Sequence, residues 1–406
     1  MTQCILFMTV GTGYGSDGYK NLASGLHTSI KHNRPDKVVF FVTDKSTKTV
    51  DYLKELYNEE EKEILAFEEV PIINPDDFNN CFETMSNVIN KYVGSDIVID
   101  YTSGTKTMSV TIAVIAIINK YNITSITGKR SNLGIVKTST EENKTQNPYQ
   151  VYDLLNYESF KKHFNNNRFE SALDSLSKII LLFDDETIEA LHDFTKMYIG
   201  WDKFHHSKPS FDYKNELFDN IRGQLQLNIK CMNILSYDGY ELYPYYLLAD
   251  LFNNAKRRYQ EGKYDDATAR LYRLLELIAQ IRLKEKYSIK TSNIDMEILE
   301  KYELNEEYIE DLEKRRSEGK IKLGLNESYK LLNNLNDDLG IYYMENEKDY
   351  RNILNIRNSS ILAHGNNPVP KDKYIEFEEM ILDIARVLRS NIDSMIEECK
   401  FPKFVI

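Results

Sequence analysis

The sequence has few of the residues that would mark it as secreted or metal-binding. Its 406 residues include only four cysteines, and none of them forms a C-x-x-C pair. Because Cys4, Cys81, Cys231 and Cys399 are scattered, neither a disulfide framework nor a zinc site is expected. We expect each cysteine to behave as a small buried hydrophobic residue.

Long apolar runs are also missing. The longest lies around residues 110–118, far short of the roughly 18 residues that a membrane span needs. The chain begins on a strand pattern at Ile5–Val10, without the basic segment and cleavage site of a signal peptide. We therefore expect a cytoplasmic protein that makes no contact with a membrane.

Positive charge is in deficit as well. The formal net charge is −12 at pH 7, which argues against broad, unspecific binding of nucleic acid. A polyanionic ligand would have to bind in a local basic pocket. Hydrophobic residues make up 42% and charged residues 28% of the chain, which is typical of a packed protein with two or three domains.

Residues 1–140 alternate between strand and helix patterns. Runs of β-branched and aromatic residues predict strands that are buried on both faces. These lie at Ile5–Val10, Lys37–Thr43, Ile64–Val70, Asp96–Tyr101 and Ile123–Thr127, with a sixth candidate at Leu133–Lys137. Helical patterns separate the strands. The alternation predicts an α/β Rossmann-like domain, with a doubly wound parallel sheet.

The pattern changes after a polar stretch at residues 139–150. Glycine and proline become rare, and long amphipathic patterns predict an all-α region. We divide this region into a helical connector at 150–244 and a helical domain at 245–406. The most regular helical pattern, Leu251–Lys286, is interrupted near Gly262. The last expected helices cover Lys348–His364 and Lys373–Glu398.

Two glycine-rich loops follow the first and fourth predicted strands. They read Thr9-Val10-Gly11-Thr12-Gly13-Tyr14-Gly15 and Asp100-Tyr101-Thr102-Ser103-Gly104-Thr105-Lys106. In the usual strand order 3-2-1-4-5 these two strands are neighbours, and their loops flank the crevice where ligands bind. Small residues, hydroxyl groups and a helix N-terminus suit a phosphate or a ribose.

The candidate ligand-binding residues come from these loops and from a basic pair after the fifth strand. They are Thr9, Gly11, Thr12, Gly13, Thr102, Ser103, Gly104, Thr105, Lys106, Lys129 and Arg130. The basic side chains among them would concentrate positive charge at the rim. Gly13-x-Gly15-x-x-Gly18 also matches a dinucleotide fingerprint, so a nicotinamide-dependent oxidoreductase is an alternative, although it leaves residues 102–106 without a role.

The Thr-Ser-Gly-Thr-Lys element and the Gly-Thr-Gly loop resemble the CARF domain of type III CRISPR-associated ribonucleases. The resemblance covers residues 1–140 and implies a pocket across a homodimer two-fold that binds a cyclic tetra- or hexa-adenylate. Some members of that family slowly cleave their own activator with pocket hydroxyl groups. The corresponding candidates here are Thr9, Thr12, Thr102 and Ser103.

The segment Arg357-Asn358-Ser359-Ser360-Ile361-Leu362-Ala363-His364-Gly365 carries candidate catalytic residues. On a helix, Arg357 and His364 would share nearly one face, about 10 Å apart along the axis. Histidine suits proton transfer near neutral pH, arginine suits a phosphate oxygen, and Asn358 could orient either group. By spacing alone, a helix-capping histidine with an unrelated arginine explains the segment better.

The Arg-Asn-x5-His-Gly pattern resembles the HEPN ribonuclease motif, and residues 257–276 resemble the first HEPN-type helix. The resemblance implies attack of an RNA 2′-hydroxyl on the neighbouring phosphate, in single-stranded RNA, by two motifs facing each other across a homodimer. That chemistry needs no metal, and the sequence has no cluster of metal ligands. The adjacent His205 and His206 would point apart on a helix, so we expect a surface pair.

Together the two resemblances predict a cyclic-oligoadenylate-activated endoribonuclease of antiviral CRISPR defence, with no cofactor apart from the activator. The alternative within the same resemblance is a CARF-type regulator that lacks ribonuclease activity.

Overall fold

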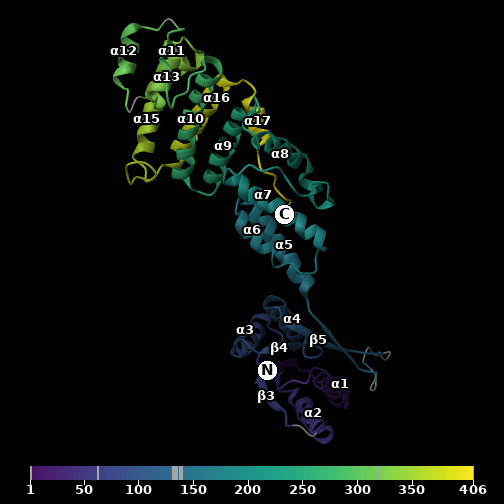
Figure 1. Ribbon diagram of the computed structural model, residues 1–406. Helices are drawn as coiled ribbons and strands as arrows, with labels where there is room; N and C mark the ends of the chain where they lie inside the picture. The colour runs from purple at the N-terminus through teal and green to yellow at the C-terminus, as the bar shows by residue number, and fades with distance from the viewer. Residues whose placement is uncertain are drawn as a thin grey trace. The chain divides into compact units, whose positions relative to one another are not determined.

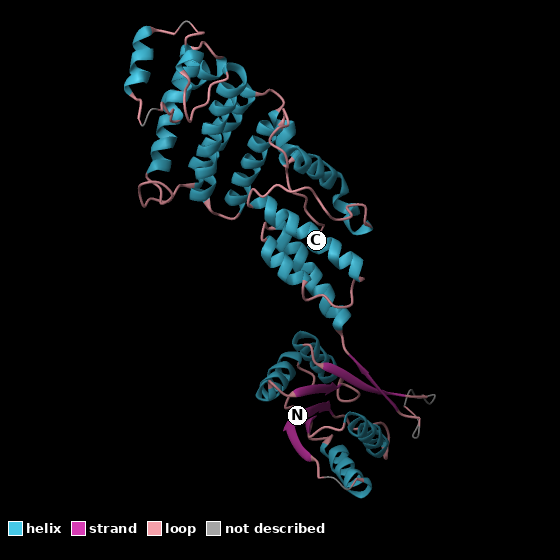
Figure 2. Ribbon diagram, in the orientation of Figure 1, coloured by secondary structure: helices cyan, strands magenta, loops and turns pink. Residues whose placement is uncertain are grey.

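The computed structural model describes residues 2–61, 64–129, 136, 140–302, 304–317 and 320–405. The chain forms two compact units. The first comprises Met1–Asn156 with Lys178–Phe183, and the second comprises Tyr157–Ser177 with Asp184–Ile406. The strands of the sheet all belong to the first unit, whereas the second unit is built from helices (Figure 2).

A six-stranded sheet forms the centre of the first unit, in the order β3-β2-β1-β4-β5-β6. Its strands are β1 (Cys4–Thr9), β2 (Lys37–Val42), β3 (Ala66–Pro71), β4 (Asp96–Asp100), β5 (Asn122–Thr127) and β6 (Glu142–Gln146). The first five run parallel. The predicted Rossmann-like fold and its strand order are confirmed.

Helices cover both faces of this sheet (Figure 1). They are α1 (Gly18–Asn33), α2 (Thr47–Glu60), α3 (Phe78–Ile89) and α4 (Lys106–Asn119), with the short 3-10 helix η1 (Asn90–Tyr92). Successive residues of a strand point to opposite faces. Phe7 and Ile99 therefore pack with α3 and α4, whereas Leu6 and Phe40 pack with α1 and α2. Burial on both faces explains the unbroken apolar runs.

Strand β6 lies within the polar stretch at residues 139–150, where no strand was predicted. It pairs antiparallel with β5, so that Ile123 lies opposite Gln146 and Thr127 lies opposite Glu142. Its residues are mostly exposed at the edge of the sheet, so no apolar alternation marks it in the sequence. The sixth strand expected at Leu133–Lys137 lies outside the described residues, apart from Val136.

The second unit is helical, and α5 passes into it from the first unit. Its elements are α5 (Tyr149–Asn165), α6 (Phe169–Leu176), α7 (Asp185–Asp202), η2 (Glu216–Ile221), α8 (Arg222–Leu235), α9 (Tyr243–Gln260), α10 (Tyr264–Tyr287), α11 (Met296–Leu299), α12 (Glu306–Lys314), α13 (Leu325–Asn334), α14 (Asp338–Glu345), α15 (Glu347–Asn358), α16 (Lys371–Leu388) and α17 (Ile392–Glu398). Within the described ranges, no helix has both the length and the hydropathy needed to cross a membrane.

Helix boundaries confirm one prediction and correct two. The expected interruption near Gly262 separates α9 from α10, and Gly262 has a positive φ of 76°. The helix expected over Lys348–His364 ends at Asn358. The helix expected over Lys373–Glu398 is two helices, because Arg389 adopts an extended conformation between α16 and α17.

Cys231 and Cys399 form a disulfide, which corrects the expectation that all four cysteines are unpaired. The two residues are 168 positions apart, so only the fold brings them together. Next to the disulfide, Asn228 on α8 donates hydrogen bonds to the carbonyls of Glu398 (2.9 Å) and Lys400 (2.7 Å). The end of α17 is thus tied to α8 by covalent and polar links.

Asp100, at the end of β4, is a fully buried carboxyl group beneath the glycine-rich loops. It accepts hydrogen bonds from the Ser29 hydroxyl (2.5 Å) and the Thr102 amide (2.7 Å). Burial raises the pKa of Asp100 above its ordinary value of 3.8, although these two hydrogen bonds oppose the shift. The folded chain therefore holds this proton more tightly than the unfolded chain, and stability is lost as the pH rises from 3.8 through the raised pKa.

We predict that Asp100→Asn melts at a higher temperature than the wild type, with a gain that grows with pH across that window. The amide can still accept from Thr102 but cannot ionise. Calorimetry over a pH series measures the effect. Asp96→Asn, at the exposed first residue of the same strand, is the matched control and should give no such gain. The prediction would be contradicted if the difference in melting temperature between Asp100→Asn and the wild type did not change with pH.

Candidate functional sites

The loops after β1 and β4 meet at the edge where these parallel neighbours end. The Ser103 hydroxyl donates to the Thr9 carbonyl at 2.7 Å and accepts from the Gly11 amide at 3.3 Å. The Gly11 carbonyl also accepts from Thr49 Oγ1 at 2.9 Å. One serine thus joins the two predicted loops, and α2 supports the first of them.

The fingerprint glycines of the first loop pack against each other. Gly13 has a φ of 72°, and a Cβ placed on it would lie 2.1 Å from the carbonyl oxygen of Gly18. This close approach requires glycine for the loop's own folding. The Gly13-x-Gly15-x-x-Gly18 pattern therefore has a structural explanation that does not involve a nicotinamide dinucleotide.

A cavity of about 410 Å³ opens between the two loops and α1. Its lining includes six of the predicted ligand-binding residues, which are Gly11, Thr12, Gly13, Thr102, Ser103 and Gly104. Thr9, Thr105, Lys106 and Lys129 are not among the lining residues, and Arg130 lies outside the described residues. Glycines and small hydroxyl residues thus make up most of the described wall.

Two of the predicted threonines hold the scaffold instead of facing the cavity. Thr9 is fully buried, and its hydroxyl donates to the carbonyl of Ser103. Thr105 is the N-cap of α4: its hydroxyl accepts from the Met108 amide at 3.1 Å and donates to the Pro75 carbonyl at 2.6 Å. The hydroxyl of Thr105 can meet both contacts because a hydroxyl group donates one hydrogen bond and still accepts another.

Lys106 and Lys129, two of the three basic residues expected at the rim, are not among the described lining of the cavity. Lys106 is exposed in the first turn of α4, and Lys129 is exposed after β5. Glu141 is the charged residue among the described lining. Sequence reasoning missed Glu141 because it belongs to the polar stretch that precedes the unexpected strand β6.

The chain reverses direction after α15 and brings His364 back toward the helix end. The His364 amide donates to the Asn358 carbonyl at 3.1 Å, and the Asn367 amide donates to the Ser359 carbonyl at 3.0 Å. Gly365 is packed so closely that a Cβ would lie 2.1 Å from the Ser359 oxygen. Arg357 and His364 therefore share a tight turn, not the face of one continuous helix.

Arg357 is held in place by α10 and by its neighbour. Its guanidinium lies over the Tyr272 ring, 4.0 Å from the centroid, and Nη1 donates to Asn358 Oδ1 at 3.1 Å. Its Nε is buried and has no hydrogen-bond partner in the described part of the chain. His364 is exposed. A positioned guanidinium and a solvent-accessible imidazole can stabilise a phosphate and move a proton.

Tyr272 is the residue of this site that sequence reasoning missed. Tyr272 lies about one helical turn from other apolar residues of α10. This helical periodicity predicts only a partly buried aromatic residue. Its burial raises the pKa of the phenol, with the Glu276 carboxylate adding to the shift. Only the packing of α10 against α15 reveals its contact with Arg357.

The arginines of the first HEPN-type helix pattern have structural partners. Arg257 is buried, donates to Asp202 Oδ1 at 2.8 Å and stacks on the Phe401 ring at 3.8 Å. Arg270 donates to Asn254 and Asp266. Arg273 is exposed and pairs with Glu276 at 3.3 Å. These contacts tie α9 and α10 to neighbouring segments.

His206 corrects the expectation of a surface histidine pair. Its side chain is only 7% exposed, and Nε2 lies 2.9 Å from Oδ2 of the fully buried Asp250. His205, next to it, is exposed. Both residues follow the end of α7 instead of lying on a helix, and His206 enters the core beside α9.

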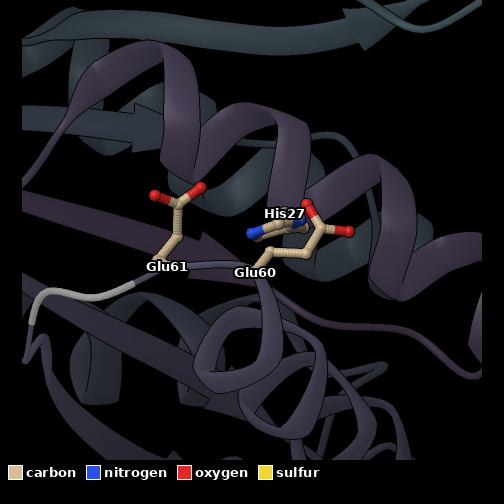
Figure 3. Close-up of side chains that lie close together, drawn as sticks. All are labelled: His27, Glu60 and Glu61. Carbon is tan, nitrogen blue, oxygen red and sulfur yellow. Dashed lines mark ion pairs between the residues drawn. The ribbon is translucent and has the colours of Figure 1, made fainter.

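His27, Glu60 and Glu61 form the group of possible metal ligands found among the described residues, with donor atoms within 4.8 Å of one another (Figure 3). The Lys31 ammonium lies 3.2 Å from Glu60 and 3.3 Å from Glu61. Burial lowers the pKa of His27, although Glu60 opposes the shift. Because Lys31 already balances the carboxylates, the cluster is explained as an ion-pair network between α1 and the end of α2.

Comparison with protein families identifies both helical regions. The Csm6 6H domain model matches residues 152–229, and the Csm6 HEPN domain model matches residues 240–388, together more than half of the chain. The chain belongs to the Csm6 family. Csm6 proteins are type III CRISPR-associated CARF–HEPN proteins, and the HEPN match confirms the prediction of an endoribonuclease. Neither the oxidoreductase nor the regulator without ribonuclease activity is retained.

A solved Csm6 structure has the same fold. Enterococcus italicus Csm6, bound to cyclic hexa-2′-fluoro-hexa-dAMP, matches with a TM-score of 0.63 and 15% identity, covering 98% of this chain and 100% of that chain. Can2 from Sulfobacillus thermosulfidooxidans, in complex with cyclic tetra-adenylate, matches with a TM-score of 0.26 and 10% identity, covering 71% of each chain. No curated protein matches the sequence significantly.

We predict that Tyr272→Leu lowers the rate of RNA cleavage about 3- to 30-fold, because the loss of a cation–π contact of about 0.5–2 kcal/mol frees the Arg357 side chain. Tyr272→Phe keeps the ring and should stay within about 2-fold of the wild type. Single-turnover cleavage of a labelled RNA measures both variants. Equal losses in the two variants would show that the hydroxyl, not the ring, is what matters.

Proposed function

We propose that this Csm6 protein is a homodimeric endoribonuclease that cleaves single-stranded RNA without a metal ion and is activated by a cyclic oligoadenylate. The proposal assigns activator sensing to residues 1–140, connection to residues 150–244 and cleavage to residues 245–406. Its catalytic residues are Arg357, Asn358 and His364.

The observation that carries the proposal is the turn after α15. It places His364 next to the end of the helix on which Arg357 is already held by Tyr272 and Asn358. In the proposed reaction, an imidazole takes the proton of a ribose 2′-hydroxyl while the 2′-oxygen attacks the adjacent phosphorus. The guanidinium stabilises the charge that develops on the phosphoryl oxygens.

The same reaction explains why a homodimer is part of the proposal. The departing 5′-oxygen needs a proton as its bond to phosphorus breaks, and one imidazole cannot be a base and an acid in the same step. Two copies of the turn, one from each chain, would supply both. The products would be a 2′,3′-cyclic phosphate and a free 5′-hydroxyl, with no hydrolytic water and no metal in the balance.

The cavity between the β1 and β4 loops is the proposed activator site. Its described wall consists largely of glycines and hydroxyl residues, so backbone amides and contacts with adenine and ribose would bind the ligand, more than lysine side chains. Because Enterococcus italicus Csm6 was solved with a cyclic hexa-adenylate analogue, the cycle of six adenylates is the first activator to test. Thr12, exposed at the cavity, is the candidate for any cleavage of the activator.

We predict that cyclic hexa- or tetra-adenylate raises the rate of RNA cleavage at least about 10-fold, and that the increase persists in a metal chelator. Labelled single-stranded RNA, incubated with and without each ring, measures the effect. Linear hexa-adenylate is the matched control. Equal cleavage with and without every ring would contradict activation, and loss of cleavage in the chelator would contradict the metal-independent mechanism.

We predict that His364→Ala reduces cleavage by about 100-fold or more, the contribution typical of a general acid or base. The variant should still bind the activator, because the mutation lies in the other compact unit. Single-turnover cleavage and calorimetric titration with the activator measure the two properties. His205→Ala, which removes another exposed histidine of the second unit, is the control and should cleave at the wild-type rate.

A further inference from the structure

A second cavity of about 360 Å³ lies beside the proposed catalytic turn, among α10, α13, α14 and α15. Two of its lining residues are those that hold Arg357: the ring of Tyr272 and the amide of Asn358. Whatever binds in this cavity therefore lies next to the phosphate that Arg357 would contact. Its volume falls within the range of small-molecule sites, about 300–1,000 Å³.

Three amide side chains line the cavity with unused hydrogen-bonding groups. Asn326 accepts from the Tyr343 hydroxyl at 2.8 Å through Oδ1, and Asn358 accepts from Arg357 through the same atom. The Nδ2 groups of both amides, and the whole side chain of Asn355, make no hydrogen bond with the described residues. The cavity thus presents amide donors and one complete amide to a ligand.

Two carboxylates add hydrogen-bond acceptors to the same wall. Glu347 pairs with Arg351 at 2.7 Å, and Glu327 lies 3.3 Å from Arg315 and 3.2 Å from Lys330. A carboxylate can accept several hydrogen bonds, so these ion pairs leave further acceptor positions. Arg351 also lines the cavity and pairs with Glu347, so N–H donors of a ligand can bind the acceptor positions that these ion pairs leave open.

The back of the cavity is rigid. Tyr343 lines it and is only 2% exposed, stacked between Tyr329 at 4.0 Å and Tyr350 at 4.7 Å. This ladder of rings runs from α13 through α14 to α15 and holds the three helices together. A wall that does not rearrange can discriminate between ligands of similar size.

We infer that this cavity is a nucleobase subsite for the RNA nucleotide next to the scissile phosphate, and that it favours adenine, cytosine and guanine over uracil. The inference rests on the proposed function. The three favoured bases carry exocyclic amino groups that can donate to Glu327 or Glu347, while the amides contact the remaining base edge. Uracil has no exocyclic amino group, and its one donor on this edge, N3–H, lies between two carbonyl oxygens, so a carboxylate that accepts from N3–H would also face an acceptor.

Binding of nucleoside 3′-monophosphates to the full-length protein tests the subsite without requiring cleavage. Calorimetric titration should give dissociation constants for 3′-AMP, 3′-CMP and 3′-GMP about 5- to 100-fold lower than for 3′-UMP. Glu347→Gln and Asn355→Ala should each reduce this difference. Asn352→Ala, on the same helix and exposed but outside the cavity lining, is the matched control and should preserve it.

Cleavage of a randomised RNA pool, followed by sequencing of the product ends, gives the second readout. Uridine should be depleted at one position flanking the cuts of the wild type, and Glu347→Gln should weaken the depletion. Absent or equal binding of the four nucleotides would overturn the inference even if RNA is cleaved. Selective nucleotide binding without any cleavage would instead overturn the proposed function and leave the subsite standing.

Discussion

At both candidate sites, two stretches of backbone come so close that no Cβ would fit between them. Gly13 meets the carbonyl of Gly18 in the loop after β1, and Gly365 meets the carbonyl of Ser359 in the turn after α15. Each contact closes a loop that would otherwise spread into solvent. The first shapes the wall of the cavity at the sheet edge, and the second returns His364 to the end of the helix that carries Arg357. The geometry of both sites depends on these contacts.

Some polar side chains of these two sites bind backbone groups of the fold, whereas others are exposed to solvent. The hydroxyl groups of Thr9, Ser103 and Thr105 form hydrogen bonds with backbone groups. Buried amides and carbonyls need such partners. Thr12 and His364 remain exposed and available to a ligand. Residues of one chemical type in one short motif therefore serve different purposes, and burial decides which.

Buried charged side chains in the helical unit lie next to partners of opposite charge or next to aromatic rings. Arg257 lies between Asp202 and the Phe401 ring, and Oδ2 of Asp250 lies 2.9 Å from Nε2 of His206. Breaking one partner of such a set leaves an uncompensated charge in the core, which is strongly destabilising. Arg257 thus supports the helical unit, and its charge is balanced within the core of an acidic chain whose net charge is −12.

Particular elements show how far the sequence alone could reach. The five parallel strands and their order were predictable, because burial on both faces leaves apolar runs and because parallel strands need crossovers. Strand β6 was not, since an exposed edge strand needs only backbone partners and can have the polar sequence Glu-Asn-Lys-Thr-Gln. The helix expected to reach His364 ended at Asn358, since a turn closed by Gly365 competes with the helix.

Arg357, Asn358 and His364 could be selected from the sequence because their residue types and spacing are local properties of one segment. The residues that surround them in the fold could not be predicted in this way. Tyr272, the disulfide of Cys231 with Cys399, and the cavity containing Asn326 and Glu347 join residues that are distant along the chain. The sequence by itself determined the five parallel strands, the helical character of the second unit and the segments that carry candidate reactive groups. Only the tertiary structure decided which side chains bind other parts of the fold and which stay exposed to solvent. The reason is that burial and hydrogen-bond partners come from elements that are distant along the chain.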